Sequence, residues 1–269
     1  HPNQGLAIFL VAFHLLFSVT LGLKWWLFTV GSRSWPDQQP RTLTPDISEE
    51  QLPVYTILLP LFREASLLPK LIESLKSLDY PTSKLDVKLV LEAVDAETIE
   101  AAKALQPPAY VDIIVVPDSQ PRTKPKACNY ALQFARGDIV TIYDAEDIPD
   151  IDQLKKVAHA FALAPHDTVC LQAELRYYNA DENWLTHWFD LEYGILFGFL
   201  HRGLARLGIP LPLGGTSNHI HLQRLKEFGA WDPYNVTEDA DLGYRMGIHG
   251  YRTLPVSSFT QEEATVTLR

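Results

Sequence analysis

Ile139-Val140-Thr141-Ile142-Tyr143-Asp144-Ala145-Glu146-Asp147 is the stretch that decides the fold of this 269-residue chain. An apolar and β-branched run ends abruptly in carboxylates, with Gly137 before it and Pro149 after it. Such a run predicts a buried strand whose carboxyl end opens into the crevice where open α/β sheets bind ligands. Carboxylate oxygens suit a hard divalent cation, Mg²⁺ or Mn²⁺, which usually bridges to substrate phosphates. The stretch therefore indicates a phosphorylated, nucleotide-linked substrate; a solvated acidic loop is the alternative.

Strands and helices alternate around this stretch. Strands are predicted at 55–60, 87–91 and 111–116, and helices at 67–78 (capped by Ser66), 96–105 and 126–134. This β-α-β-α order predicts an α/β fold with a mostly parallel sheet and helices on both faces.

Composition limits the partners. The net charge of −10 leaves no basic face for a nucleic acid, and 46% hydrophobic content supports a sizeable core. Cys128 and Cys170 lie in apolar surroundings without metal-ligand spacing, so we expect both to be reduced core residues.

The first part of the chain is nearly all apolar from Gly5 to Val30. We predict a transmembrane helix at 1–31, anchored at the interface by Lys24, Trp25 and Trp26, in contact with membrane lipids. A buried core helix and a signal peptide are the alternatives. Arg33 and Arg41 follow the span, which predicts an inner (plasma) membrane protein with a cytoplasmic catalytic domain.

The remaining boundaries follow from composition. A proline-rich linker is predicted at 32–53, the catalytic domain at 54–260, and the start of a truncated C-terminal region at 261–269. Because the chain starts at His1 and stops in mid-pattern, we infer a segment of a longer protein. An aromatic-rich helix is predicted at 183–202; it lies on a membrane, caps a groove or packs in the core.

Taken in order, these segments resemble an inverting glycosyltransferase of family 2 with a GT-A fold, the group that includes bacterial cellulose synthase. The resemblance covers roughly residues 53–255. It is carried by five segments: Pro60-Leu61-Phe62-Arg63-Glu64, Glu92 with Asp95, Lys124-Pro125-Lys126-Ala127-Cys128-Asn129, Asp144-Ala145-Glu146 and Thr237-Glu238-Asp239. The spacing after Pro60 and after Glu92, and the Glu at position 146, depart from the family pattern.

The resemblance implies roles for these residues. Nucleotide contacts are expected from Pro60, Phe62, Glu64, Glu92, Lys126 and Asp144, and ligation of Mg²⁺ or Mn²⁺ from Asp144 and Glu146. Asp239, with Glu238 beside it, is expected to be the catalytic base, since a sugar hydroxyl needs a positioned carboxylate to take its proton. Acceptor contacts are expected from Gly215, Thr216, Ser217 and Trp231, with Gln172 a weaker candidate. His219 and His221 are expected to be structural or to line the acceptor site.

These roles imply an enzyme that transfers a sugar, glucose by analogy, from a UDP-sugar donor to a growing β-linked polysaccharide. A transferase that adds single sugars to a lipid carrier, and a non-catalytic sugar-nucleotide-binding regulatory subunit, are the alternatives. The Gln-x-x-Arg-Trp segment of processive members is absent from these residues. A haloacid dehalogenase-type phosphohydrolase fits less well, because its Asp-x-Asp follows the first strand and Asp144 follows three earlier ones.

Overall fold

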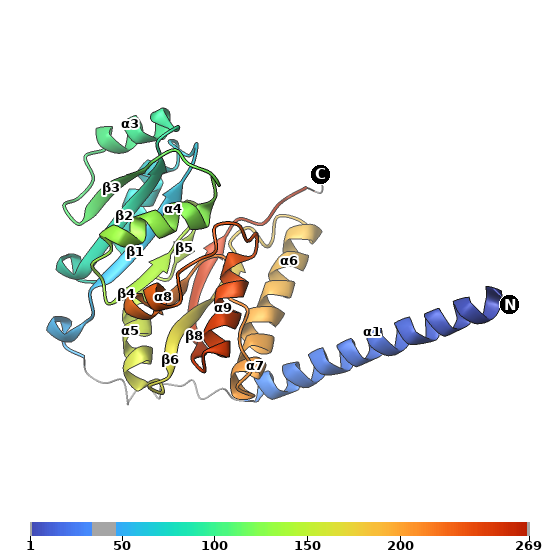
Figure 1. Ribbon diagram of the computed structural model, residues 1–269. Coiled ribbons are helices and arrows are strands. Elements are labelled where there is room, and N and C mark those ends of the chain that lie inside the picture. Colours follow the sequence, from blue (N-terminus) through green and yellow to red (C-terminus); the bar gives the residue numbers. More distant parts are fainter. Residues whose placement is uncertain (1, 34–46, 268–269) are drawn as a thin grey trace.

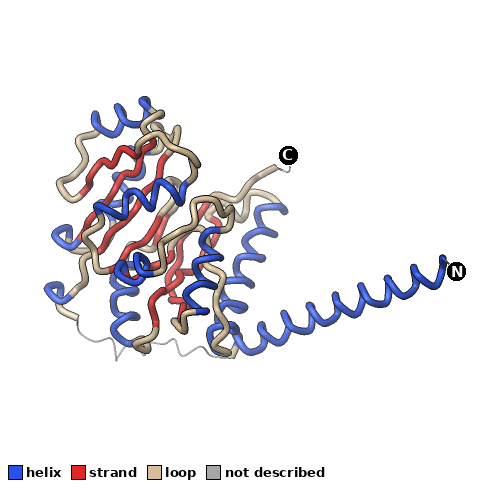
Figure 2. The backbone as a smooth tube through the Cα atoms, in the orientation of Figure 1, coloured by secondary structure: helices blue, strands red, loops and turns tan. Residues whose placement is uncertain are grey.

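One mixed sheet organises the molecule (Figures 1 and 2). The computed structural model describes residues 2–33 and 47–267. The strand order is β3-β2-β1-β4-β7-β6-β8-β5. The strands are β1 (Tyr55–Leu61), β2 (Leu85–Glu92), β3 (Val111–Val116), β4 (Ile139–Ile142), β5 (Ile148–Pro149), β6 (Thr168–Tyr177), β7 (Asn218–His221) and β8 (Arg252–Glu262).

Nine α-helices are seen in the described residues: α1 (Pro2–Ser32), α2 (Leu68–Ser77), α3 (Ala96–Ala104), α4 (Lys124–Ala131), α5 (Gln153–Leu163), α6 (Trp184–Ile195), α7 (His201–Arg206), α8 (Leu222–Glu227) and α9 (Glu238–Ile248). Short turns are η1 (Glu49–Gln51), η2 (Thr82–Lys84), η3 (Leu132–Phe134) and the π-helical η4 (Leu196–Leu200).

The first four strands are parallel, as predicted. β1 pairs with β2 on one side and with β4 on the other, Leu58 lying beside Ile142. The chain turns to opposite sides of β1 when it forms β2 and β4, so the carboxyl ends of β1 and β4 flank the crevice in which such sheets bind ligands. The second half is mixed, because β7 is antiparallel to both β4 and β6.

Two apolar cores cover the two faces of the sheet. Helices α2, α3 and α5 pack on one face, and α4, α8 and α9 pack on the other. Cys128 and Cys170 are buried free thiols in the second core, as expected. The aromatic Trp231, which is almost fully buried, belongs to the same core.

Three of the predicted helices differ in detail from the structure. Helix α2 is not capped by Ser66: it begins after Leu67, without a side-chain cap, because Pro69 in the first turn has no N–H to satisfy. Helix α4 begins at Lys124, two residues early, since Pro125 fits a first helical turn. The helix predicted over 183–202 is interrupted by the five-residue π-helical segment η4, which separates α6 from α7.

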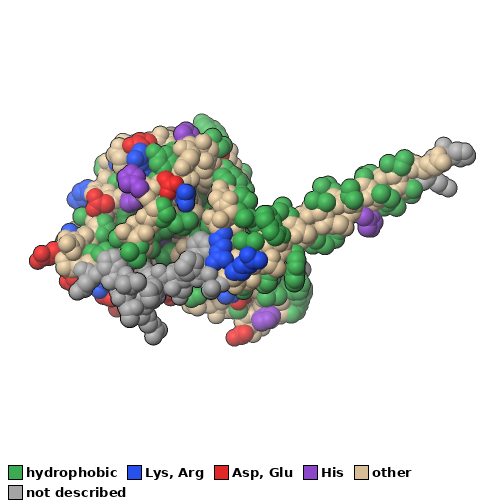
Figure 3. Space-filling model, turned by 90° about the horizontal axis from the view of Figure 1, so that it is seen from below, with side chains coloured by type: hydrophobic (Ala, Val, Ile, Leu, Met, Phe, Trp, Pro, Cys, Tyr) green, Lys and Arg blue, Asp and Glu red, His purple; other side chains and the backbone are tan. Residues whose placement is uncertain are grey.

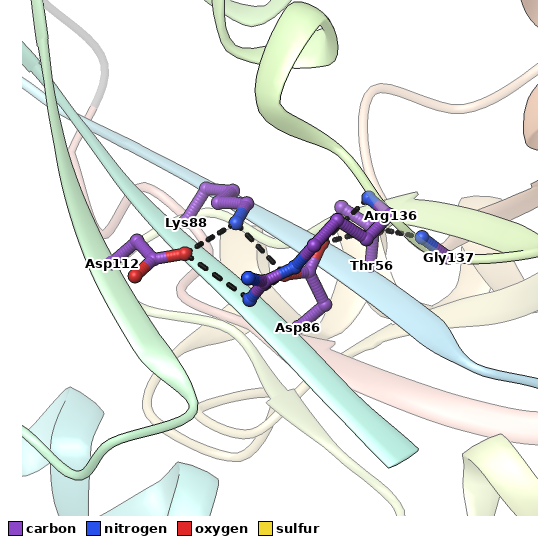
Figure 4. Close-up of polar contacts among 6 residues, drawn as sticks. All are labelled: Thr56, Asp86, Lys88, Asp112, Arg136 and Gly137. Atoms are coloured by element: carbon purple, nitrogen blue, oxygen red, sulfur yellow. Dashed lines mark hydrogen bonds and ion pairs between the residues drawn. The ribbon is translucent and has the colours of Figure 1, made fainter. Parts of the chain in front are cut away.

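An ion-pair network closes the amino ends of the strands (Figure 4). The Lys88 ammonium lies 2.8 Å from Asp86 and 2.5 Å from Asp112, and the Lys88 and Asp86 side chains are both 1% exposed. Arg136 also pairs with Asp86, and Thr56 donates to the same carboxylate. All these groups lie at the end of the sheet opposite to the crevice, so they stabilise the fold without entering the ligand site.

Helix α1 projects from the rest of the molecule (Figure 1) and has the length and composition of a membrane span. Its side chains are exposed along most of its length, and apolar side chains cover it in the view of Figure 3. Only its last turns pack, against η4 and α7, with the Phe28 and Phe199 rings 4.5 Å apart. Of the linker predicted over 32–53, residues 34–46 lie outside the described part. Strand β8 continues to Glu262, past the boundary predicted at 260.

Candidate active site

A cavity of about 280 Å³ lies at the carboxyl ends of β1 and β4. Its walls come from the segments that the sequence singled out, and they include Pro60, Phe62, Glu64, Glu92, Lys124 and Asp144. The parallel pairing of β1 with β4 brings the first of these groups beside the last, although more than 80 residues separate them. The structure therefore brings together residues that had been predicted to bind a nucleotide.

One end of this cavity is aromatic and acidic. The Phe62 ring is 47% exposed, and the Arg63 guanidinium carbon lies 5.1 Å from its centre. Arg63 has a left-handed backbone (φ 59°), and its N–H donates to the Asp95 carboxylate at 2.5 Å. Asp95 also caps α3, which gives it a structural task. Burial, with smaller contributions from Glu146 and Asp144, raises the pKa of Glu64.

Two lysines of α4 reach two different carboxylates. The Lys124 ammonium lies 2.6 Å from Asp144 and donates to the Gly215 carbonyl at 3.0 Å, whereas the Lys126 ammonium lies 2.8 Å from Glu92. Burial alone would lower the pKa of Lys124, but the Asp144 carboxylate outweighs it and holds that pKa above the ordinary value. Lys124 is therefore the lysine that adjoins Asp144, whereas Lys126, the residue predicted to contact the nucleotide, adjoins Glu92.

Carboxylates from two segments gather around Asp144. Asp144 and Glu146 follow β4, and Glu262 ends β8. Burial, then repulsion from Asp144 and Glu146, raises the pKa of Glu262 to about 7. Sequence reasoning missed Glu262, because nothing local distinguishes it from the neighbouring Glu263.

The donor chemistry fits a hard cation. Among the residues described, no three His, Cys, Asp or Glu side chains form a ready-made metal site. Mg²⁺ typically uses one or two carboxylates and completes its shell with water and substrate phosphates, so Asp144 with Glu146 or Glu262 meets that requirement. The mutual repulsion that raises the Glu262 pKa is what such a cation would relieve.

Asp147, the third carboxylate after strand β4, is buried beneath the segment 213–218. It accepts hydrogen bonds from the Asp144 N–H and from the Thr216 hydroxyl. Burial, with repulsion from Asp144, raises its pKa to about 8. These contacts tie the β4 turn to the segment 213–218 and so fix where Asp144 points.

Asp239 lies in the first turn of α9 and is 7% exposed. Its Oδ1 accepts from the Trp231 indole at 3.0 Å and from the Asn218 amide at 3.4 Å. Burial raises the pKa of Asp239 to about 7, although Lys124 acts in the opposite direction. A carboxylate that titrates near neutral pH is suited to accept a proton from a substrate.

The loop from Leu213 to Ser217 borders this carboxylate. Gly215 is exposed, and a methyl group added to it would lie 3.9 Å from the Asp239 Oδ2. The side chains of Thr216 and Ser217 are buried, and Gln172 donates to the Thr216 carbonyl and accepts from the Gly214 N–H. The loop thus borders Asp239 and Lys124 with the backbone of Gly215, not with the buried side chains of Thr216 and Ser217.

Several predicted site residues occupy supporting positions. Trp231, predicted to contact an acceptor, is 2% exposed and contacts Asp239 instead, since the second core encloses its ring. Glu238 is partly exposed beside Asp239. His219 is fully buried and hydrogen-bonds Tyr55 and Gln153, as expected of a structural histidine, while His221 packs against Phe161.

Comparison with solved structures places the fold in the GT-A-like class. A mannosyltransferase from Pyrobaculum calidifontis, solved with GDP-mannose and Mn²⁺, matches with a TM-score of 0.70 and 21% identity over 97% of this chain and 68% of that one. TarS of S. aureus, solved with UDP-GlcNAc, matches with a TM-score of 0.54 and 14% identity over 78% of this chain and 59% of that one.

Sequence comparison gives the family. Residues 53–268 match the family described as glycosyltransferase like family 2, so the chain belongs to the family 2 glycosyltransferases. The β-monoglucosyldiacylglycerol synthase of Synechocystis is 26% identical over 86% of this chain and 48% of its own length. Glucomannan 4-β-mannosyltransferase 1 of Oryza sativa is 22% identical over 77% of this chain and 41% of its own length. The chain spans about half the length of these curated relatives.

Proposed function

We propose that this protein transfers a hexose, with inversion, from a UDP-sugar to an acceptor hydroxyl, using Asp239 as the base. The observation that carries the proposal is the placement of a buried carboxylate with a pKa of about 7 beside the exposed Gly215. Lys124 joins Gly215 to Asp144, so this carboxylate also adjoins the nucleotide cavity.

The proton transfer follows from this placement. The acceptor hydroxyl attacks the anomeric carbon while Asp239 takes its proton, and the bond between that carbon and the diphosphate oxygen breaks. The Trp231 and Asn218 donors hold Asp239 Oδ1, which leaves Oδ2 on the Gly215 side as the proton acceptor. Displacement from one face converts an α-linked donor into a β-linked product.

The leaving diphosphate needs positive charge. The Lys124 ammonium pairs with Asp144, and it would move from that carboxylate to the diphosphate. Asp144 and Glu146, with Glu262, would hold Mg²⁺ or Mn²⁺, which stabilises the charge that develops on the departing phosphate. The structural relative solved with Mn²⁺ supports this choice of ions.

The nucleoside would bind in the β1 end of the cavity. Phe62 offers a ring for stacking, and Pro60, Glu64 and Glu92 line the same cavity. Relatives solved with GDP-mannose and with UDP-GlcNAc bind nucleotide sugars of both bases. We assign UDP on the resemblance of the motifs, with glucose as the sugar.

We consider two acceptors. A growing β-linked polysaccharide follows from the resemblance to polysaccharide synthases. A membrane lipid that receives a single sugar is the second candidate, and the glucolipid synthases among the relatives and the apolar helix α1 favour it. We place α1 across the inner membrane, with the catalytic domain on the cytoplasmic side.

Calorimetric titration with UDP, with and without Mn²⁺, tests the donor site. We expect metal-dependent binding that Asp144→Asn abolishes, whereas Glu100→Gln on the distant α3 leaves it unchanged. Metal-independent binding, or equal binding by Asp144→Asn, would refute the assignment. Asp239→Asn should bind UDP normally and transfer no sugar in the full-length protein; unchanged transfer would favour a non-catalytic sensor.

A further inference from the structure

Helix α6 carries an apolar stripe on its outer side. Its inner side packs on β6, where the Tyr177 and Tyr193 rings are 4.5 Å apart. The outer side exposes four large apolar residues, Trp184, Trp188, Leu191 and Ile195, the two tryptophans being 74% and 62% exposed. At about 100° per residue, these four positions fall within an arc of roughly 60°. This is one continuous stripe, not scattered exposure.

The stripe lies on the flank of the molecule from which α1 departs. In Figure 1, α6 forms the edge of the globular part, and α1 and α6 diverge from the same place, α7. The last turns of α1 are fixed to this place: a methyl group added to Gly31 would lie 1.9 Å from the Phe199 carbonyl oxygen, and one added to Gly203 would lie 2.4 Å from that of Leu27. Such close contact sets the direction of α1 relative to α6.

The charge at this junction suits an anionic membrane surface. Arg33 follows α1 directly, and Arg206 donates to the Val30 carbonyl at the end of α1. Figure 3 shows Lys and Arg side chains gathered where the long helix leaves the globular part. Anionic lipids of the cytoplasmic leaflet attract basic groups that lie close to the membrane surface. Exposed tryptophans prefer the interface between headgroups and acyl chains.

We propose that the stripe Trp184, Trp188, Leu191 and Ile195 is a membrane-binding surface that seats α6 in the headgroup region of an anionic bilayer. The inference rests on the proposed placement of α1 across that membrane. Together, α1 and α6 form two attachments with α7 between them. Because no helix or strand separates α7 from the loop that borders Asp239, the seating holds the acceptor side of the site at the bilayer surface and favours a lipid acceptor.

Labelled cysteines test the seating without any turnover. Leu191→Cys and the control Glu100→Cys on the exposed part of α3 are labelled with an environment-sensitive fluorophore; Cys128 and Cys170 are fully buried and do not compete. The whole protein is placed in vesicles of phosphatidylcholine and phosphatidylglycerol. We expect blue-shifted emission from the Leu191 position, quenching by lipid-borne nitroxide, and several-fold weaker quenching by iodide than at position 100.

Two results would overturn the proposal. Equal iodide quenching at both positions would show that the stripe faces water. Protection from iodide without nitroxide quenching would show that protein, such as a second copy of this chain, covers the stripe. Neither result depends on catalysis, so a failure of membrane binding would leave the proposed activity standing. Conversely, a protein whose stripe lies in the membrane but which transfers no sugar would refute the proposed activity and leave the membrane-binding surface standing.

Discussion

The Trp231 indole lowers the pKa of the proposed base Asp239 against the larger effect of burial, and its removal gives a quantitative prediction. In Trp231→Phe the ring still fills most of the space in the second core, but the hydrogen bond to Asp239 is lost. Hydrogen bonds to charged groups contribute about 1.5–3 kcal/mol. One pKa unit corresponds to about 1.4 kcal/mol. The loss therefore corresponds to about one unit at least.

The sign follows from which form the bond stabilises. The indole donates to the ionised carboxylate, so its loss favours the protonated form and raises the pKa of Asp239 from about 7 to about 8, with the Asn218 amide still in place. At pH 7 the ionised fraction would fall from about one half to about one tenth, which lowers kcat about five-fold. Above pH 9 the two enzymes should differ by less than about two-fold.

The assay is release of UDP across pH 5.5–9.5, with donor and acceptor saturating. The matched control is Tyr234→Phe, an exposed aromatic residue of the same segment, which should leave the profile in place. A uniform loss of kcat at every pH in Trp231→Phe would refute the reasoning, because it would indicate a packing defect, whose effect on kcat does not disappear at high pH. An unmoved profile would refute the assignment of the base.

Three further outcomes are expected. Lys124→Met should weaken UDP binding in calorimetry far more than Lys126→Met, since only Lys124 adjoins Asp144; equal losses would be evidence against it. Lys88→Met should lower the free energy of unfolding by about 1.5–3 kcal/mol in urea, because the buried Asp86 carboxylate loses one charged donor but keeps Arg136 and Thr56; a loss under about 0.5 kcal/mol would contradict this. Burial raises the Asp239 pKa from 3.8 to about 7, so the folded state binds the extra proton and its ionisation costs stability as pH rises through this window. Asp239→Asn should therefore gain thermal midpoint over the parent at pH 8 and not at pH 4; an equal difference at both would exclude the linkage.

The first half of the fold was predictable because local signals agreed there. Continuous apolar runs that end in polar residues gave β1 to β4, and the parallel order followed from the helices between them. The same runs placed Asp144 at a strand end, and the acidic first turn of α9 placed Asp239. Local patterns suffice where the backbone period and the burial pattern coincide.

Other features depend on contacts between distant segments. The helix predicted from Lys126 begins instead at Lys124, and it is Lys124 that reaches Asp144 while Lys126 pairs with Glu92; helix ends are the least certain part of any pattern. Glu262 enters the site because β8 pairs with both β5 and β6, which lie far from it in sequence. Trp231 has the composition of a sugar contact, and only the packing of the second core shows that it lies behind the base.

The glycine pair where α1 crosses α7 has a practical consequence for protein production. A protein that lacks residues 1–33 would lose more than a membrane anchor. The Phe199 ring and the backbone around Gly203 would lose the helix that covers them. The newly exposed apolar patch would adjoin the α6 stripe and enlarge the aggregation-prone surface of the fragment. A water-soluble version therefore requires polar substitutions in the part of α1 before Leu27, with the turns from Leu27 to Gly31 kept, and not deletion of the whole helix.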